Sequence, residues 1–331
     1  MKILFLKILI MQYRLYLMRG FFYNSKDKGT FFLKRKYFYF CEMMKVENCH
    51  WKRSKSVELF GKLWIPDGEM AALVIMVHGV GQHSECYDEL AGKFVGQSVG
   101  FLAFDLRGHG RSTGTRGHAS FNDIRDDLRT IIEDMRRKFA NIPIVLLGYS
   151  MGGSIVLRYA IDKNVMVQGV IALSPWLQLV HPPSPFLIWL AKWASRIVPW
   201  LTVRTGIKAD QLSQGNNPGR KTTKTDPLLH KKISIKLFTD LWTCGNIMLR
   251  NKYRFEIPVL MMHGTADTLV SFKASKLFAK RNRKFIYFKK WTKMRHDLLN
   301  EAGNEMIFRY MMYWLSKQVI KNGTFQNNSQ L

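Results

Sequence analysis

A serine between glycines, in the segment 148–152 (GYSMG), is the feature of this sequence best suited to chemistry. The strand-like run PIVLL precedes it at 143–147, and the helix-like run MGGSIVLRYAI follows it at 151–161. A G-x-S-x-G serine between a buried strand and a helix lies on a sharp turn that only glycines allow, and its hydroxyl is exposed for nucleophilic attack. We therefore predict that Ser150 is a catalytic nucleophile.

A serine hydroxyl is a weak nucleophile at neutral pH and needs a histidine base that a carboxylate orients. When the serine lies in G-x-S-x-G, these partners follow in the order Ser, Asp, His. The apolar run 257–264 (IPVLMMHG) is followed by Asp267, and the strand-like run 284–288 leads into a loop that carries His296. The order and the positions after predicted strands agree, so we predict that Asp267 and His296 complete a catalytic triad with Ser150.

Two backbone N–H groups are candidates for binding the negatively charged oxygen that forms during attack on a carbonyl. Met151 opens the helix after the serine, where backbone N–H groups point toward an anion. The continuous apolar run 71–77 (AALVIMV) is typical of a strand buried on both faces, and it leads into 78–81 (HGVG). The glycines there allow a close approach of the backbone, so Val80 is predicted to supply the second N–H donor.

Two further histidines lie at the ends of predicted strands, and we interpret both as structural. His78 is expected to hold the loop that contains Val80, and His263 is expected to pack beneath the site, next to the turn at Gly264.

The elements that must position these residues alternate between strand and helix. Further strand-like runs lie at 57–65, 99–105 and 167–174, and a helix is expected over 120–139 with Ser120 as its N-cap. This alternation predicts an α/β fold, with a mostly parallel central sheet flanked by helices.

The alternation stops between residues 175 and 255, and this segment is predicted to form an inserted helical cap over the site. Its apolar residues recur at helical spacing and include Phe186, Trp189, Leu190, Trp193, Ile197 and Trp200. Two interpretations of this face stay open at this point. It packs against the core, or it forms an acyl-chain tunnel or contacts a lipid interface.

The chain resembles the α/β-hydrolases of the monoacylglycerol lipase and lysophospholipase group, which overlaps with sequences described as serine aminopeptidases. The resemblance covers about residues 57–317 and is carried by the segments 78–84, 108–112, 148–153, 263–267 and 296–301. It implies the α/β-hydrolase fold and hydrolysis of the carboxylic ester of a single-chain lipid through an acyl-enzyme. It also implies that Ser150, Asp267 and His296 suffice for this reaction, with no metal and no organic cofactor.

Three positions differ from what is common in that group. The group commonly has an acidic residue where this chain has Gln82, an arginine where it has Cys86 and a histidine where it has Tyr149. The first two positions lie near the head-group end of the pocket in the group, so the head group stays open. A peptidase or a small-ester carboxylesterase on the same triad is the alternative. A non-catalytic binding protein is disfavoured because no triad residue is missing.

Length and composition agree with one large α/β domain that carries an inserted cap, in a chain of 331 residues. The formal net charge is +27, but the basic residues are scattered and match no nucleic-acid-binding motif. A basic surface favours contact with anionic membranes, where lipid substrates reside, but a biased base composition is an equally simple cause of the charge. With the lipid ester substrate that the resemblance implies, we expect peripheral membrane contact and no nucleic-acid partner. The four cysteines have no paired spacing, which indicates neither a disulfide framework nor a metal site and favours a cytoplasmic, reducing setting.

Residues 1–43 form an N-terminal extension before the predicted hydrolase domain at 44–331. Lys2, Lys7 and Arg14 interrupt its apolar residues, so no run is long enough to span a bilayer. Two interpretations stay open, a segment that lies on a membrane surface and a mis-assigned start before Met43 or Met44. The second is favoured because the predicted fold is complete without the extension.

Overall fold

The computed structural model describes residues 44–162, 164–214 and 223–320. The two interpretations of residues 1–43 concern a segment outside these described residues.

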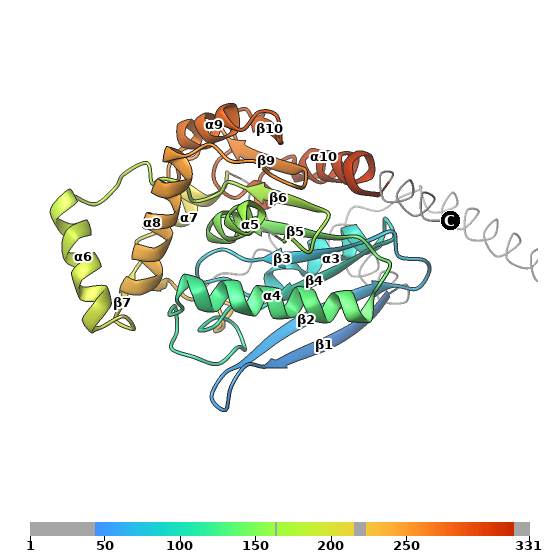
Figure 1. Ribbon diagram of the computed structural model, residues 1–331, viewed down its shortest axis with the longest axis horizontal. Helices are drawn as coiled ribbons and strands as arrows, with labels where there is room; N and C mark the ends of the chain where they lie inside the picture. The colour runs from blue at the N-terminus through green and yellow to red at the C-terminus, as the bar shows by residue number, and fades with distance from the viewer. Residues whose placement is uncertain (1–43, 163, 215–222, 321–331) are drawn as a thin grey trace, which may run out of the picture. The chain divides into compact units, whose positions relative to one another are not determined.

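The described strands build one eight-stranded sheet in the order β1-β2-β4-β3-β5-β6-β9-β10 (Figure 1). Its pairs are parallel from β4 to β10, whereas β1 pairs with β2 and β2 with β4 in antiparallel fashion. The predicted, mostly parallel α/β sheet is therefore confirmed. The strands are β1 (Met44–Lys52), β2 (Glu58–Pro66), β3 (Ala72–Val77), β4 (Val99–Phe104), β5 (Ile144–Tyr149), β6 (Gly169–Leu173), β9 (Val259–Gly264) and β10 (Ile286–Trp291).

Helices cover both faces of this sheet, because alternate residues of each central strand point to opposite sides. In β3 all six residues are buried, with Leu73, Ile75 and Val77 in one core cluster and Val74 and Met76 in the other. The first cluster also contains residues of α4 (Phe121–Lys138), α5 (Met151–Ile161), α8 (Ile235–Arg250) and α9 (Phe272–Arg281). The second contains residues of α3 (Asp88–Val95) and α10 (Asn304–Leu315).

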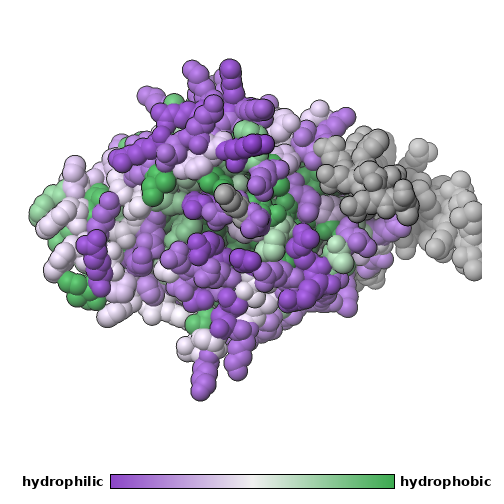
Figure 2. All heavy atoms as spheres, viewed as in Figure 1, coloured by the Kyte–Doolittle hydropathy of each residue, from purple (hydrophilic) through white to green (hydrophobic). Residues whose placement is uncertain are grey.

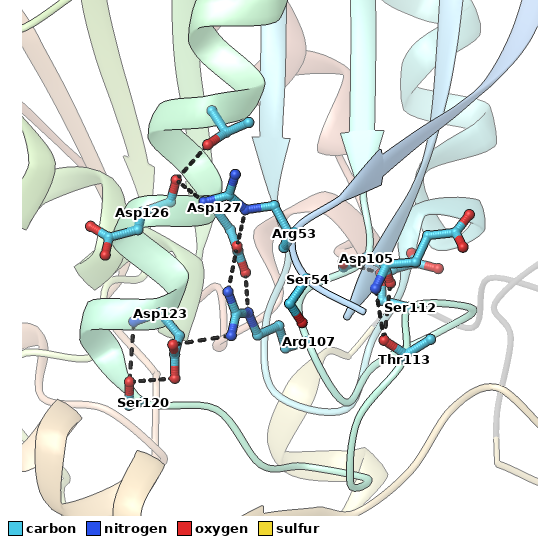
Figure 3. A network of polar contacts seen from close by, with 12 residues as sticks. Arg53, Ser54, Asp105, Arg107, Ser112, Thr113, Ser120, Asp123, Asp126 and Asp127 are labelled. Carbon is cyan, nitrogen blue, oxygen red and sulfur yellow. Dashed lines mark hydrogen bonds and ion pairs between the residues drawn. The ribbon is translucent and has the colours of Figure 1, made fainter. Parts of the chain in front are cut away.

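A network of charged residues ties helix α4 to the loop after β4 (Figure 3). The Arg107 guanidinium donates to both carboxylate oxygens of Asp127, at 2.6 and 2.8 Å, and to Asp123 at 3.0 Å. Arg53 donates to Asp127 from another side at 2.9 Å. Ser120 caps the helix as predicted, because its hydroxyl accepts the backbone N–H of Asp123. The network holds in place the loop that packs beside the site.

Between β6 and β9 the chain forms α6 (Pro185–Ile197), β7 (Thr202–Arg204), α7 (Ala209–Leu212), β8 (Lys232–Ser234) and α8. This is the segment predicted to be the cap. Figure 1 shows α6 at the outer edge of the molecule, with α8 between it and the sheet. Shorter helical turns lie at η1 (Ser84–Tyr87), η2 (Leu298–Asn300) and η3 (Ser316–Ile320).

The apolar residues of α6 face outward, although their helical spacing was also compatible with packing on the core. Ile188 is the one residue of this helix that is buried, whereas Phe186 is 66% exposed and Trp189 61% exposed. Figure 2 shows hydrophobic residues at the surface in this region of the molecule. The interpretation in which this face packs against the core is therefore wrong. Among the residues that the structure describes, no helix is both long and apolar enough to cross a bilayer.

Candidate active site

Ser150 lies at the junction between β5 and α5, in a backbone conformation that is rare for a residue with a side chain. Its φ and ψ are 56° and −113°, and its N–H donates to the carbonyl oxygen of Leu173 at 2.9 Å. A Cβ atom at Gly148 would lie 2.3 Å from the carbonyl oxygen of Gly152, and one at Gly152 would lie 1.9 Å from that of Val77. Both glycines are therefore required by close backbone contact, as the G-x-S-x-G pattern indicates.

The structure brings Ser150, His296 and Asp267 together from three different strand ends. The Ser150 hydroxyl lies 2.9 Å from His296 Nε2, and His296 Nδ1 lies 2.7 Å from Asp267 Oδ2. His296 is 3% exposed and Asp267 is 8% exposed, so water has little access to this line of hydrogen bonds. The ring of Tyr149 lies against the His296 ring, with 5.2 Å between the centroids. The arrangement can move a proton from the hydroxyl to the imidazole while the carboxylate holds the other ring nitrogen.

Asp267 is held by four hydrogen-bond donors. Its Oδ1 accepts the backbone N–H groups of Leu269 at 2.8 Å and Val270 at 3.0 Å. Its Oδ2 lies within hydrogen-bond distance of His296 Nδ1 and of His263 Nε2, the latter at 3.0 Å. Burial raises the pKa of Asp267, but the charge of His296 and the hydrogen bonds from both histidines outweigh it and hold the pKa below its usual range.

The loop that carries Val80 follows β3, and the side chains of His78 and Gln82 hold it in place. His78 Nδ1 donates to the carbonyl oxygen of Gly79 at 2.8 Å, and its Nε2 accepts the N–H of Leu106 at 3.0 Å. Burial lowers the pKa of His78 from its usual 6.5 to about 3, so the ring is neutral and holds the loop, as predicted. Gln82 Oε1 accepts the N–H of Gly79 at 3.0 Å and the hydroxyl of Tyr87 at 2.8 Å.

Val80 and Met151 lie on backbone segments that meet at the serine. Gly152, in the first turn of α5, contacts the backbone of Val77 and His78, where the Val80 loop begins. The role of both N–H groups as oxyanion donors remains a prediction.

Several residues beside the site were not predicted from the sequence. His83 Nε2 lies 3.0 Å from Asp226 Oδ2, which comes from the segment between β6 and β9. The backbone N–H of His230 donates to the carbonyl oxygen of Gly81 at 3.0 Å. The hydrogen bond between His263 and Asp267 was not predicted either, since a histidine at the end of a buried strand indicated packing beneath the site. Position at a strand end was the one signal in the sequence that pointed to His263.

Comparison with known proteins places this geometry in a family. The family described as serine aminopeptidase, S33, matches residues 68–303. Human monoglyceride lipase is 30% identical over 281 residues, which cover 80% of this chain and 89% of that protein. The crystal structure of Paleococcus ferrophilus monoacylglycerol lipase is 29% identical, with a TM-score of 0.69, and the match covers 82% of this chain and 98% of that one.

The chain is also similar to part of a longer protein. An abhydrolase domain-containing protein of Dictyostelium discoideum is 27% identical over 78% of this chain, which spans 28% of that protein's length. The family match and the two lipases agree with the α/β sheet and with the serine at its edge. The chain therefore belongs to the α/β-hydrolase family described as serine aminopeptidase, S33, in the group that includes the monoacylglycerol lipases.

Proposed function

We propose that this protein hydrolyses the carboxylic ester of a single-chain lipid, a monoacylglycerol or a lysophospholipid, with Ser150 as nucleophile. The observation that carries the proposal is the line of hydrogen bonds from Ser150 through His296 to Asp267, with distances of 2.9 and 2.7 Å. The substrate class follows from the similarity to the monoacylglycerol lipases of human and Paleococcus ferrophilus.

In the proposed reaction, His296 Nε2 takes the Ser150 proton as Oγ attacks the ester carbonyl carbon. The Val80 and Met151 N–H groups stabilise the oxyanion, and the Asp267 carboxylate holds the Nδ1–H of His296. The protonated His296 then gives its proton to the departing alcohol oxygen, which leaves an acyl-Ser150 ester. Water, deprotonated by His296, attacks this ester, releases the fatty acid and restores the Ser150 hydroxyl.

The test measures fatty-acid release from monooleoylglycerol and from lysophosphatidylcholine, with Ser150→Ala as the blank. We expect release from at least one lipid and a loss of kcat of about 10⁴-fold or more in the variant. A third substrate, an aminoacyl arylamide, tests the peptidase alternative. Cleavage of the arylamide without fatty-acid release would replace the lipase proposal by that alternative.

The outward apolar face of α6 supports a peripheral contact with a lipid interface. Trp189 and Trp193 of α6 are 61% and 54% exposed, and Trp200, which follows the helix, is 55% exposed; a cluster of exposed apolar residues is typical of an interaction surface. Lys192 and Arg196 are exposed on the same helix, and basic residues among aromatic ones are typical of helices that bind anionic membrane surfaces. We infer that α6 is the part of the protein that contacts the lipid interface.

A further inference from the structure

A second histidine, His263, contacts the carboxylate of the candidate triad. His263, the penultimate residue of β9, places Nε2 3.0 Å from Asp267 Oδ2, the same oxygen that lies 2.7 Å from His296 Nδ1. The other ring nitrogen of His263 lies 2.8 Å from Ser275 Oγ on α9. His263 and Ser275 are both 0% exposed, so these contacts are sealed from water.

Whether the His263 ring is neutral or protonated, the Asp267 carboxylate accepts, so His263 Nε2 carries a proton. When the His263 ring is neutral, its Nδ1 has a lone pair, and the Ser275 hydroxyl can donate to it. The Asp267 carboxylate selects this tautomer, because the opposite one would set the Nε2 lone pair against Asp267 Oδ2, and the Ser275 hydroxyl then satisfies the lone pair on Nδ1.

Because His263 and His296 contact the same oxygen of Asp267, the contact with His263 also affects how His296 is held. Backbone N–H groups of Leu269 and Val270 hold Oδ1, and His263 holds Oδ2. Rotation of the carboxylate would break three hydrogen bonds in a buried site, even with His296 absent. Oδ2 is therefore already directed at His296 Nδ1 before any substrate arrives, which is the kind of support that a precise catalytic site requires.

We propose that His263 and Ser275 are positioning residues that extend the triad into a five-residue chain, Ser150–His296–Asp267–His263–Ser275. Ser275 holds the orientation of the His263 ring, His263 fixes the Asp267 carboxylate, and the carboxylate fixes the His296 ring. This inference rests on the proposed role of the triad and adds two residues to it.

The test compares two substitutions at one position. His263→Leu removes the donor, whereas His263→Gln retains an N–H close to the position of the original Nε2–H. We expect the leucine variant to lose about 10- to 100-fold in kcat with KM within about 2-fold, because a misoriented imidazole slows the chemistry but not substrate binding. The glutamine variant is expected to recover kcat to within about 3-fold of the parent.

A second, less disruptive variant is included because His263→Leu leaves the buried Ser275 hydroxyl without its partner, which lowers stability. Ser275→Ala keeps the core packed and is expected to lower kcat about 3- to 10-fold. Its control is Thr239→Val, which removes a buried hydroxyl that bonds to Lys236 within α8, 3.0 Å away, and leaves kcat unchanged. The downfield proton NMR signal of His296 Nδ1–H is expected to broaden or shift in His263→Leu and Ser275→Ala, and to stay in Thr239→Val.

Labelling of Ser150 by a fluorophosphonate separates failure of this inference from failure of the proposed function. If the parent protein hydrolyses neither lipid but Ser150 is labelled, the substrate proposal fails, and the labelling rate replaces kcat as the readout. Equal rates in the parent, His263→Leu and Ser275→Ala would overturn the positioning role. So would equal losses in the leucine and glutamine variants, because a retained donor would then bring no recovery.

Discussion

The backbone N–H of His230 donates to the carbonyl oxygen of Gly81 across 3.0 Å, so the segment inserted between β6 and β9 is bonded to the loop that carries Val80. A Cβ atom at Gly81 would lie 1.9 Å from the His230 carbonyl oxygen, and the Gly81 φ of +75° also favours glycine. Two close backbone contacts at one glycine couple the position of this segment to the shape of the candidate oxyanion loop.

Asp226 strengthens the same junction, and its removal should impair catalysis. Its carboxylate lies 3.0 Å from the buried His83 Nε2 and also accepts the N–H of Leu228 at 2.9 Å. Asp226→Ala leaves the His83 ring without this partner, so we expect a loss of about 1–3 kcal/mol in the free energy of unfolding and about 10-fold in kcat. Urea unfolding and steady-state kinetics measure the two effects.

The control for this experiment is Asp210→Ala, which removes an exposed carboxylate from α7 of the same inserted segment. Its kcat and stability should match those of the parent. Equal kcat in the parent and Asp226→Ala would show that the candidate oxyanion loop keeps its shape without this contact.

Asp127 should be important for stability rather than for catalysis. Its side chain is 1% exposed and accepts three hydrogen bonds from Arg53 and Arg107, at 2.6 to 2.9 Å. Asp127→Ala leaves both guanidinium groups without this carboxylate, so we expect the free energy of unfolding to fall by about 3 kcal/mol. The exposed Asp126, paired with Arg125, provides the matched control, and Asp126→Ala should lower stability by less than about 1 kcal/mol. Similar losses in both variants would contradict the role assigned to the buried pair.

The sequence was sufficient to predict the residues that converge in the site, because strand ends of a parallel sheet meet at one edge. Ser150, Asp267 and His296 each follow a strand, and the order along the chain agrees with the geometry that the structure shows. The partner of His83 could not be predicted in this way, since Asp226 lies 143 positions later in an irregular segment. No periodicity links two such residues.

Two other features could not be predicted, because the sequence pattern is the same for two environments. A histidine at the end of a buried strand looks the same whether its ring packs against apolar side chains or bonds to a carboxylate, as His263 does. The spacing of Trp189 and Trp193 indicates an apolar helix face but not the neighbour of that face. The structure places α8 against α6 and leaves both tryptophans exposed.

Two buried histidines, His78 and His109, and the half-buried His230 should make the protein sensitive to acid. Burial lowers the pKa of His78 from its usual 6.5 to about 3, that of His230 from 6.5 to about 4, and that of His109 well below 6.5. The unfolded chain binds protons at these rings near pH 6.5, whereas in the folded protein His78 does so only near pH 3, His230 near pH 4 and His109 well below pH 6.5. The free energy of unfolding should therefore fall as the pH decreases through this window, by up to about 1.4 kcal/mol per pH unit for each ring.

Urea unfolding between about pH 7 and pH 5, above the range in which most carboxylates titrate, measures this dependence. His109→Asn provides the comparison, because the amide N–H can replace His109 Nδ1–H, which donates to the Arg107 carbonyl oxygen at 2.9 Å. The asparagine variant should show a shallower dependence on pH. The same slope in both proteins would exclude His109 from the proton uptake.

The exposed apolar face of α6 should control binding to lipid surfaces. We expect the double variant Trp189→Ser/Trp193→Ser to lose about 10-fold or more in affinity for vesicles of phosphatidylcholine and phosphatidylserine, since both side chains are more than half exposed and would enter the interface. Cosedimentation measures the affinity, and hydrolysis of a short-chain, water-soluble ester shows whether the site is intact. Tyr313→Ser, a change at an aromatic residue of α10 that is 61% exposed, should leave vesicle binding unchanged. If the double variant binds as the parent does, then α6 does not carry the membrane contact, and the tryptophans face a different partner.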